Sequence, residues 1–91
     1  MHFEWDVRKA EENFSRHGID FEDAIGIFDG TTLEGEDDRF DYGETRVRAI
    51  GALGPILITV VYTMRGEVCR IISARKATRN ERKAYREAQS G

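Results

Sequence analysis

The chain has 91 residues, of which 40% are apolar and 34% charged, with a single proline and a formal net charge of −3. This composition excludes a disordered or low-complexity chain, which would have too few apolar residues to form a core. The length predicts one compact domain over residues 1–91, with room for one site.

The cysteine count and the apolar runs restrict the setting of the protein. Cys69 is the only cysteine, so no intramolecular disulfide can form, and no Cys/His spacing typical of a zinc site is present. The longest apolar stretch, "PILITVVY", is far shorter than the ~20 residues of a membrane helix, and "MHFEWDVRK" lacks a signal core. We therefore expect a cytoplasmic protein that does not bind a membrane, with Cys69 in its core.

The charge is divided unevenly along the chain. Residues 1–45 carry 14 acidic and 4 basic side chains, a net charge of −10, whereas residues 46–91 carry 3 acidic and 10 basic, a net charge of +7. Because salt screens electrostatic attraction over about 8 Å, a basic surface can coexist with an acidic one. The second half is therefore the expected surface for an anionic partner.

The N-terminal segment predicts a short strand followed by a helix. A strand over residues 2–5 precedes Asp6, a suitable N-cap for a helix that runs to about His17, and Gly18 supplies a left-handed stop. The expected core side of this helix carries Val7, Ala10 and Phe14.

A second helix and a long connection follow. Asp20 is the expected N-cap in "DFEDAIGIF", and the apolar residues after it have the spacing of a core-facing helix. Residues 29–43 are rich in Gly and Asp and predict a connection, with a short strand near 31–33. The apolar positions of the helix are Phe21, Ala24, Ile25 and Phe28.

The second half predicts three strands and a helix. Strands are expected over 44–53, 56–64 and 67–74, separated by "GP" and "RG" turns, as an antiparallel meander. The pair Thr78 and Glu81 forms a capping box that opens a helix to about residue 89. The fold class is therefore α+β, with the order β-α-α-β-β-β-α and an antiparallel sheet packed by helices.

Four stretches, which together cover nearly the whole sequence, are "FEWDVRKAEENFSRHGIDFEDAIGIFD", "GETRVRAIG", "VVYTMRG" and "RIISARKATRNERKAYRE". In this combination and order they resemble the BrnT family of toxins. The resemblance implies a RelE-like fold and a ribonuclease that halts translation. It also implies neutralisation by a BrnA-type antitoxin, itself a DNA-binding repressor, in a dimer or a toxin–antitoxin hetero-oligomer. Two positions depart from the family pattern: Arg16 replaces a common lysine, and Met64 stands where a glutamate is often found.

RNA cleavage without a metal needs a proton acceptor, cations for the phosphate and a proton donor. Arg65 and Arg75 are the leading candidates for phosphate stabilisation, because a guanidinium fork matches phosphate oxygens. We expect Arg75 to share a strand face with Ser73, Ile71 and Cys69. Either arginine can alternatively pair with a carboxylate.

The first helix offers further candidates. Lys9, Asn13 and Arg16 share one helical face that can contact phosphate, although any exposed helix carries such residues. His17 can act as acid or base, but a histidine before a terminal Gly also complements the helix dipole.

The last helix contributes charge. Glu81 and Tyr85 can transfer protons, although a cap and an anchor explain them equally. The aromatic residues Trp5 and Tyr62 are expected in the core. No motif indicates a cofactor or a metal site. We expect one side of the helix to form a track for RNA or an acidic partner, although a solvated helix face carries similar residues; the cations are Arg79, Arg82, Lys83 and Arg86.

The sequence thus predicts a metal-independent ribonuclease toxin. Two alternatives are a non-enzymatic toxin on the same scaffold that binds a protein such as a topoisomerase, and a plain nucleic-acid-binding module, because fold alone does not determine activity.

Overall fold

The computed structural model describes residues 1–38 and 43–90. In chain order the elements are β1 (His2–Glu4), α1 (Val7–His17), α2 (Phe21–Ala24), the 3-10 helix η1 (Ile25–Asp29), β2 (Leu33–Glu36), β3 (Val47–Leu53), β4 (Ile56–Arg65), β5 (Val68–Lys76) and α3 (Arg79–Ser90). The α+β class is confirmed. The expected second helix is divided into α2 and η1, and a short strand does form in the connection, slightly later than expected.

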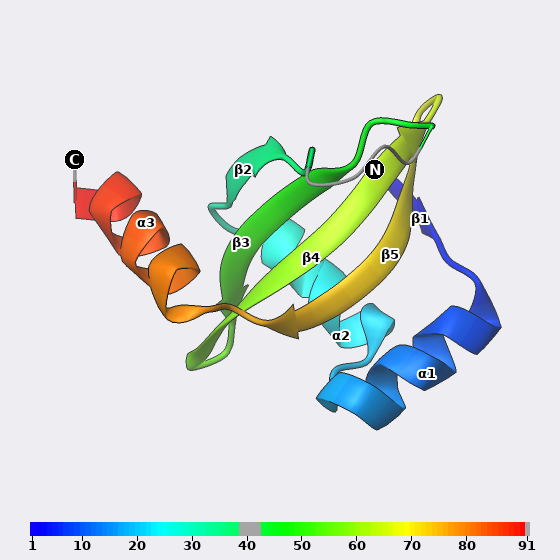
Figure 1. Cartoon of the computed structure of the whole chain (residues 1–91), viewed down its shortest axis with the longest axis horizontal. Helices are drawn as coiled ribbons and strands as arrows, with labels where there is room; N and C mark the ends of the chain where they lie inside the picture. The colour runs from blue at the N-terminus through cyan, green and yellow to red at the C-terminus, as the bar shows by residue number, and fades with distance from the viewer. Residues whose placement is uncertain (39–42, 91) are drawn as a thin grey trace.

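The five strands form one mixed sheet in the order β1-β5-β4-β3-β2 (Figure 1). The strands from β2 to β5 pair antiparallel as a meander, whereas β1 pairs with β5 in parallel. The expectation of a purely antiparallel sheet is therefore wrong. The N-terminal strand adds to the free edge of β5, a pairing between chain ends that no local pattern reveals.

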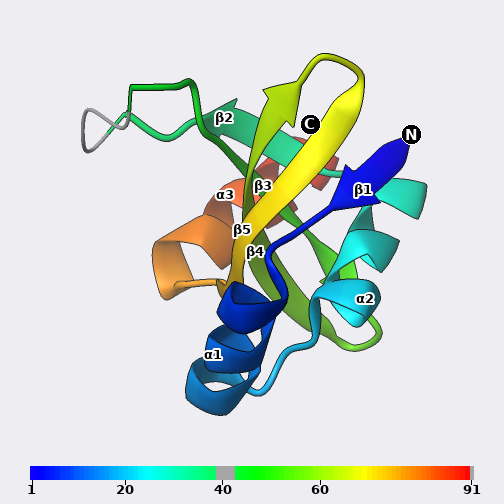
Figure 2. The same cartoon turned by 90° about the vertical axis from the view of Figure 1, so that its right-hand side faces the viewer.

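One face of the sheet is covered by α2 and η1, and α3 leaves the sheet on the other side (Figures 1 and 2). Gly51 of β3 permits close packing of η1, because a Cβ there would lie 2.8 Å from the Cβ of Ile27. Trp5 and Tyr62 pack against this core, as expected, and Cys69 is fully buried. The buried core residues are Ile19, Phe21, Ala24, Ile27, Ala49, Ile58, Val60, Cys69, Ile71 and Ala74.

Helix α1 packs beside the edge of β5, with a different side inward from the one expected. Asp6 and Gly18 cap it as predicted: the Asp6 side chain accepts hydrogen bonds from two backbone amides, and Gly18 has a φ of 71°. Val7 and Phe14, however, are 68% and 52% exposed, whereas Asn13 is buried. Ala10 packs against the core as predicted, but the predicted burial of Val7 and Phe14 and the predicted exposure of Asn13 are wrong.

The reason is that the Asn13 amide pairs with the backbone of β5. Its Nδ2 donates to the carbonyls of Ala74, at 2.9 Å, and Ile19, at 3.1 Å, and its Oδ1 accepts from the Ala74 N–H at 3.1 Å. Strand β1 pairs only with residues 68–70 of β5. The Asn13 side chain therefore satisfies backbone groups of β5 beyond the end of β1, and these bonds fix α1 to the sheet.

A β-bulge in β5 determines where Arg75 points. Val61 pairs with Ser73 but Tyr62 pairs with Ile71, so Ile72 is an extra residue. The side-chain alternation is reversed beyond the bulge. Ser73 and Arg75 consequently lie on the face opposite Cys69 and Ile71, and the expectation that they share one face is wrong.

Candidate active site

The face opposite α2 is rich in arginine, and we call it the arginine face. Along β4 it carries Thr59, Val61, Thr63 and Arg65, and their register partners on the neighbouring strands share it. The arginines that lie on it are Arg48 on β3, Arg65 on β4, and Arg70 and Arg75 on β5.

Arg75 is held by Glu81 from the first turn of α3. Arg75 Nη1 donates to Glu81 Oε1 at 2.7 Å and Nη2 donates to Oε2 at 3.0 Å, while Nη1 also donates to the Lys76 carbonyl at 3.3 Å. A guanidinium has a second pair of donors on its Nε–Nη2 edge. Within residues 1–38 and 43–90, the hydrogen bonds of Arg75 all come from Nη1 and Nη2, so the Nε–Nη2 edge keeps donors that an oxyanion can use.

Glu81 is the centre of a buried polar cluster. It completes the predicted capping box, because Oε1 accepts from the Thr78 N–H at 2.8 Å and the Thr78 hydroxyl accepts from the Glu81 N–H at 3.2 Å. Oε1 also accepts from the Thr59 hydroxyl at 3.0 Å, and Arg48 Nη1 lies 3.7 Å from Oε2. The Glu81 carboxylate therefore connects α3 to β3, β4 and β5.

This surrounding keeps Glu81 ionised. Burial alone raises the pKa of the Glu81 carboxyl, but the hydrogen bond from Arg75, the Thr78 backbone and the charge of Arg75 outweigh it and lower the pKa to about 2. A carboxylate with such a low pKa and occupied oxygens accepts protons poorly near neutral pH. The geometry thus favours the capping and pairing roles of Glu81 over proton transfer.

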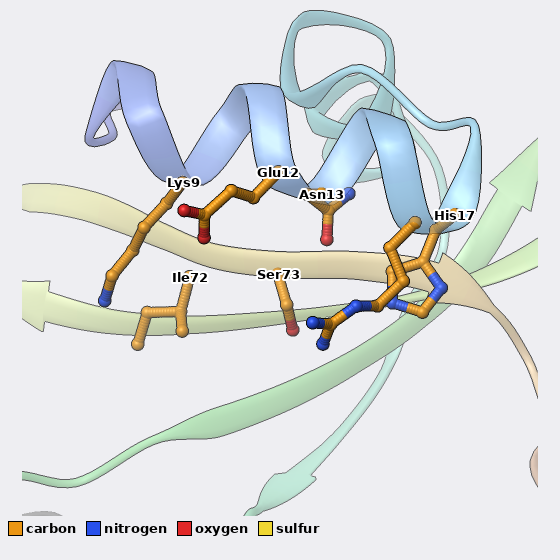
Figure 3. A pocket seen from close by; sticks show the side chains of 7 residues that line it. Lys9, Glu12, Asn13, His17, Ile72 and Ser73 are labelled. Carbon is orange, nitrogen blue, oxygen red and sulfur yellow. The ribbon is translucent and has the colours of Figure 1, made fainter.

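Helix α1 and β5 enclose a hollow of about 220 Å³. Figure 3 shows Lys9 and His17 near its two ends, with the Ser73 side chain between them. Ser73 reaches it because the bulge turns this residue away from the core. We call it the α1 hollow, and its lining residues are Lys9, Glu12, Asn13, Arg16, His17, Ile72 and Ser73.

A second hollow continues from the α1 hollow to the end of β5. Arg16 and His17 line both hollows, and the second is completed by Arg75, Lys76 and Thr78. The structure thus brings five of the predicted site residues along one continuous surface: Lys9, Asn13, Arg16, His17 and Arg75. Three cations and an imidazole there can bind a phosphate and exchange a proton with it.

The comparisons with known proteins agree with this chemistry. Residues 5–81 match the family model described as the ribonuclease toxin BrnT of a type II toxin–antitoxin system. The chain belongs to the BrnT family of ribonuclease toxins. Its structure is similar to the crystal structure of the Brucella abortus ribonuclease toxin BrnT, with a TM-score of 0.64 and 30% sequence identity over 87% of this chain and 99% of that one. No curated protein matches the chain.

Family membership confirms the predicted activity class. A ribonuclease toxin of a type II system has an RNA target and an antitoxin partner, which sets this chain apart from a plain nucleic-acid-binding module. No helix in the described part of the chain is long and apolar enough to cross a membrane. Among the same residues, no group of three or more His, Cys, Asp or Glu side chains is placed to hold a metal ion.

The second leading arginine of this BrnT-family chain lies far from the first. Arg65 pairs with Val68 at the hairpin end of β4, whereas Arg75 pairs with Thr59. Six residues of β4 separate the two positions, which corresponds to about 20 Å along the strand. Arg65 is 57% exposed, with Glu44 at 4.0 Å. Arg65 therefore lies outside the hollows that Arg75 lines, and we retain Arg75 as the candidate for the reacting phosphate.

The cations of α3 form a separate groove. It is lined by the four predicted residues Arg79, Arg82, Lys83 and Arg86, together with Asn80, Glu87 and Ser90. Tyr85 points elsewhere, since its hydroxyl donates to the Thr31 carbonyl at 3.1 Å and anchors α3 to the segment before β2. The groove is thus a surface for an anionic chain, and its residues do not line the hollows beside α1.

Sequence reasoning missed Arg48, Thr59 and Ser73 as members of the site. The alternation "TRVRAI" places Arg48 on the opposite face from Ala49. That alternation is a usable signal, but only once the direction of the core is known. No pattern in the sequence identifies Ser73 as a site residue, because the face on which it lies depends on the bulge at Ile72.

Proposed function

We propose that this ribonuclease cleaves RNA by attack of a ribose 2′-hydroxyl on the adjacent phosphate, where the end of α1 meets the end of β5. The observation that carries the proposal is Arg75, which Glu81 holds by one edge while the other edge is available. A held guanidinium needs little reorganisation when charge develops on the phosphate, and such preorganised donors supply the largest electrostatic benefit.

The other groups have separate roles in this reaction. His17 takes the proton of the 2′-hydroxyl, and the oxygen then forms a bond to phosphorus as the bond to the 5′-oxygen breaks. Arg75, with Arg16 beside it in the second hollow, stabilises the negative charge of the pentavalent phosphate. Lys9, at the other end of the α1 hollow, binds the RNA backbone farther along the chain. The departing 5′-oxygen takes a proton from water, which leaves a 2′,3′-cyclic phosphate on one fragment and a 5′-hydroxyl on the other.

Cleavage proceeds without a metal ion in this proposal. The charge stabilisation that a metal would provide is available from the guanidinium groups of Arg75 and Arg16. Asn13 has a positioning role, because its amide bonds the backbone of Ala74 beside Arg75.

The partner of this toxin is a BrnA-type antitoxin, a DNA-binding repressor, in a cytoplasmic hetero-oligomer. The excess of basic residues in the second half favours an acidic docking element. Inhibition is direct if that element covers Arg75, so a complex that leaves Arg75 open to solvent would contradict occlusion of the site.

The test is cleavage of purified RNA in excess EDTA, followed by analysis of the fragment ends. We expect cleavage to persist and to give cyclic or 3′-phosphate ends with 5′-hydroxyls. His17→Ala should slow the reaction by about 10²–10⁴-fold, whereas His2→Ala is the matched control, because His2 is the exposed first residue of β1. Complete loss in EDTA that Mg²⁺ restores, or fragments with 5′-phosphates, would contradict the mechanism.

A further inference from the structure

A third hollow, between the sheet and α3, lies on the other side of Arg75. It has a volume of about 570 Å³, within the range typical of small-molecule sites. We call it the α3 hollow, and its lining residues are Leu33, Glu34, Gly35, Arg48, Ile50, Arg75, Thr78, Asn80, Glu81 and Ala84. Arg75 lines both this hollow and the one beside α1.

The floor of the α3 hollow follows from the strand register. Arg75 pairs with Thr59, Thr59 with Ile50, and Ile50 with Leu33, so these residues form one row across four strands of the arginine face. Neighbouring strands are about 4.8 Å apart, which places Ile50 about 10 Å from Arg75 along the row. The row therefore begins with a cation and ends on an apolar surface, and between them Thr59 is buried with its hydroxyl bonded to Glu81.

The adjacent row leaves space above this apolar surface. Arg48 pairs with Gly35, and a Cβ built on Gly35 would meet no atom within 4 Å. Arg48 is 38% exposed and its guanidinium is near Glu81, as Arg75 is. A planar guanidinium can stack on an aromatic base while it also attracts the RNA backbone. Ala84 of α3 supplies an apolar wall opposite the strands.

We propose that the α3 hollow binds the base of a nucleotide next to the scissile phosphate, an inference that rests on the proposed cleavage at Arg75. The phosphate lies at Arg75, the sugar passes the Glu81 carboxylate, to which the buried Thr59 is hydrogen-bonded, and the base lies against Ile50 and Leu33 beside Arg48. A nucleotide is favoured over a protein side chain because the apolar surface lies only about 10 Å along the row from the phosphate-binding cation. Two arginines beside an apolar floor complement a group that is anionic at one end and aromatic at the other.

Larger side chains can fill the α3 hollow from either side, while Arg48 and Arg75 stay unchanged. Ala84→Leu adds volume from exposed α3 at little cost in helix propensity, and Gly35→Val adds it from β2, where the backbone conformation accepts any residue. Ala88→Leu is the matched control, because Ala88 is exposed on the same helix and does not line the hollow.

The experiment is an NMR titration with nucleoside 3′-monophosphates, nucleoside 5′-monophosphates and inorganic phosphate. One of the two nucleotides should bind the unmodified protein more tightly than the other. We expect Ala84→Leu and Gly35→Val to lower the affinity for that nucleotide by about tenfold or more, as loss of base stacking does. Inorganic phosphate should bind all variants equally, and Ala88→Leu should bind the nucleotide like the unmodified protein.

Cleavage assays on the same proteins separate this inference from the proposed function. If the unmodified protein fails to cleave RNA, the proposed function is wrong. If it cleaves RNA, but the two filled variants bind nucleotides and select cleavage positions like Ala88→Leu, the base site is wrong. Filled variants that keep nucleotide affinity and lose only antitoxin affinity would likewise overturn the inference and assign the hollow to the protein partner.

Discussion

Glu81 holds Arg75 through both carboxylate oxygens, at 2.7 and 3.0 Å, and the same carboxylate caps α3. The ion pair therefore has two functions. It joins α3 to the sheet, and it holds the Arg75 guanidinium in place between the two hollows that Arg75 lines. Because Glu81 occupies only the Nη1–Nη2 edge, Arg75 can pair with this carboxylate and bind a phosphate at the same time.

Glu81→Gln should lower the free energy of unfolding, and it should also make that free energy less sensitive to acidic pH. The pKa of Glu81 is lowered from 4.5 to about 2 in the folded protein, so the carboxylate contributes stability above pH 4.5 that is lost as pH falls toward 2. The variant should lose on the order of 2 kcal/mol at pH 7, because a glutamine cannot pair with Arg75. Its unfolding free energy should then vary less between pH 5 and pH 2, a window set by this pKa shift.

Urea denaturation at several pH values measures this effect. Glu87→Gln is the control, since Glu87 is an exposed residue on the same helix. Equal acid sensitivity in the unmodified protein and Glu81→Gln would show that this ion pair does not contribute to stability.

Asn13→Ala should destabilise the protein although it removes no apolar group. The change leaves the Ala74 N–H and carbonyl without the partners that Asn13 provides, and each unsatisfied buried group costs about 1–3 kcal/mol. Asn13→Asp should also be destabilising, because a carboxylate oxygen cannot donate to the Ala74 carbonyl.

Thermal denaturation tests the Asn13 variants against Glu11→Ala, a change at an exposed position of α1. A melting temperature for Asn13→Ala that equals that of Glu11→Ala would contradict the role of Asn13 in fixing α1 to β5.

The cation groove on α3 should set the salt dependence of RNA binding. Replacing Lys83 and Arg86 by Gln removes two charges from this groove, and each lost phosphate contact should lower the slope of log affinity against log salt by about 0.7–1. Filter binding across a salt series provides the slope, with Arg8→Gln on the exposed surface of α1 as the control. An unchanged slope in the double variant would place the RNA path elsewhere.

Local signals in the sequence predicted the helix ends well. The caps at Asp6, Gly18 and Thr78 depend on residues close in the chain, and each forms as expected. The pattern also identified Lys9, Arg16, His17 and Arg75, which the structure brings to one continuous surface.

The incorrect predictions have non-local causes. The parallel pairing of β1 with β5 joins the two ends of the chain, and the bulge at Ile72 reverses the face of Arg75. The inward side of α1 is determined by Asn13, a polar residue whose partner is 61 positions away. Apolar periodicity cannot detect a helix that is fixed by an amide, so Val7 and Phe14 were predicted to be buried.

The most direct test is the rate of RNA cleavage by Arg75→Ala, measured per folded molecule beside a melting curve. We expect the fold to survive and turnover to fall by on the order of 10²-fold or more, the cost of removing a preorganised donor. Arg75→Lys should recover only part of the rate, because an ammonium keeps the charge but has no second edge to present when Glu81 binds it. An Arg75→Ala protein that is folded and fully active would contradict the assignment of Arg75 to the reacting phosphate.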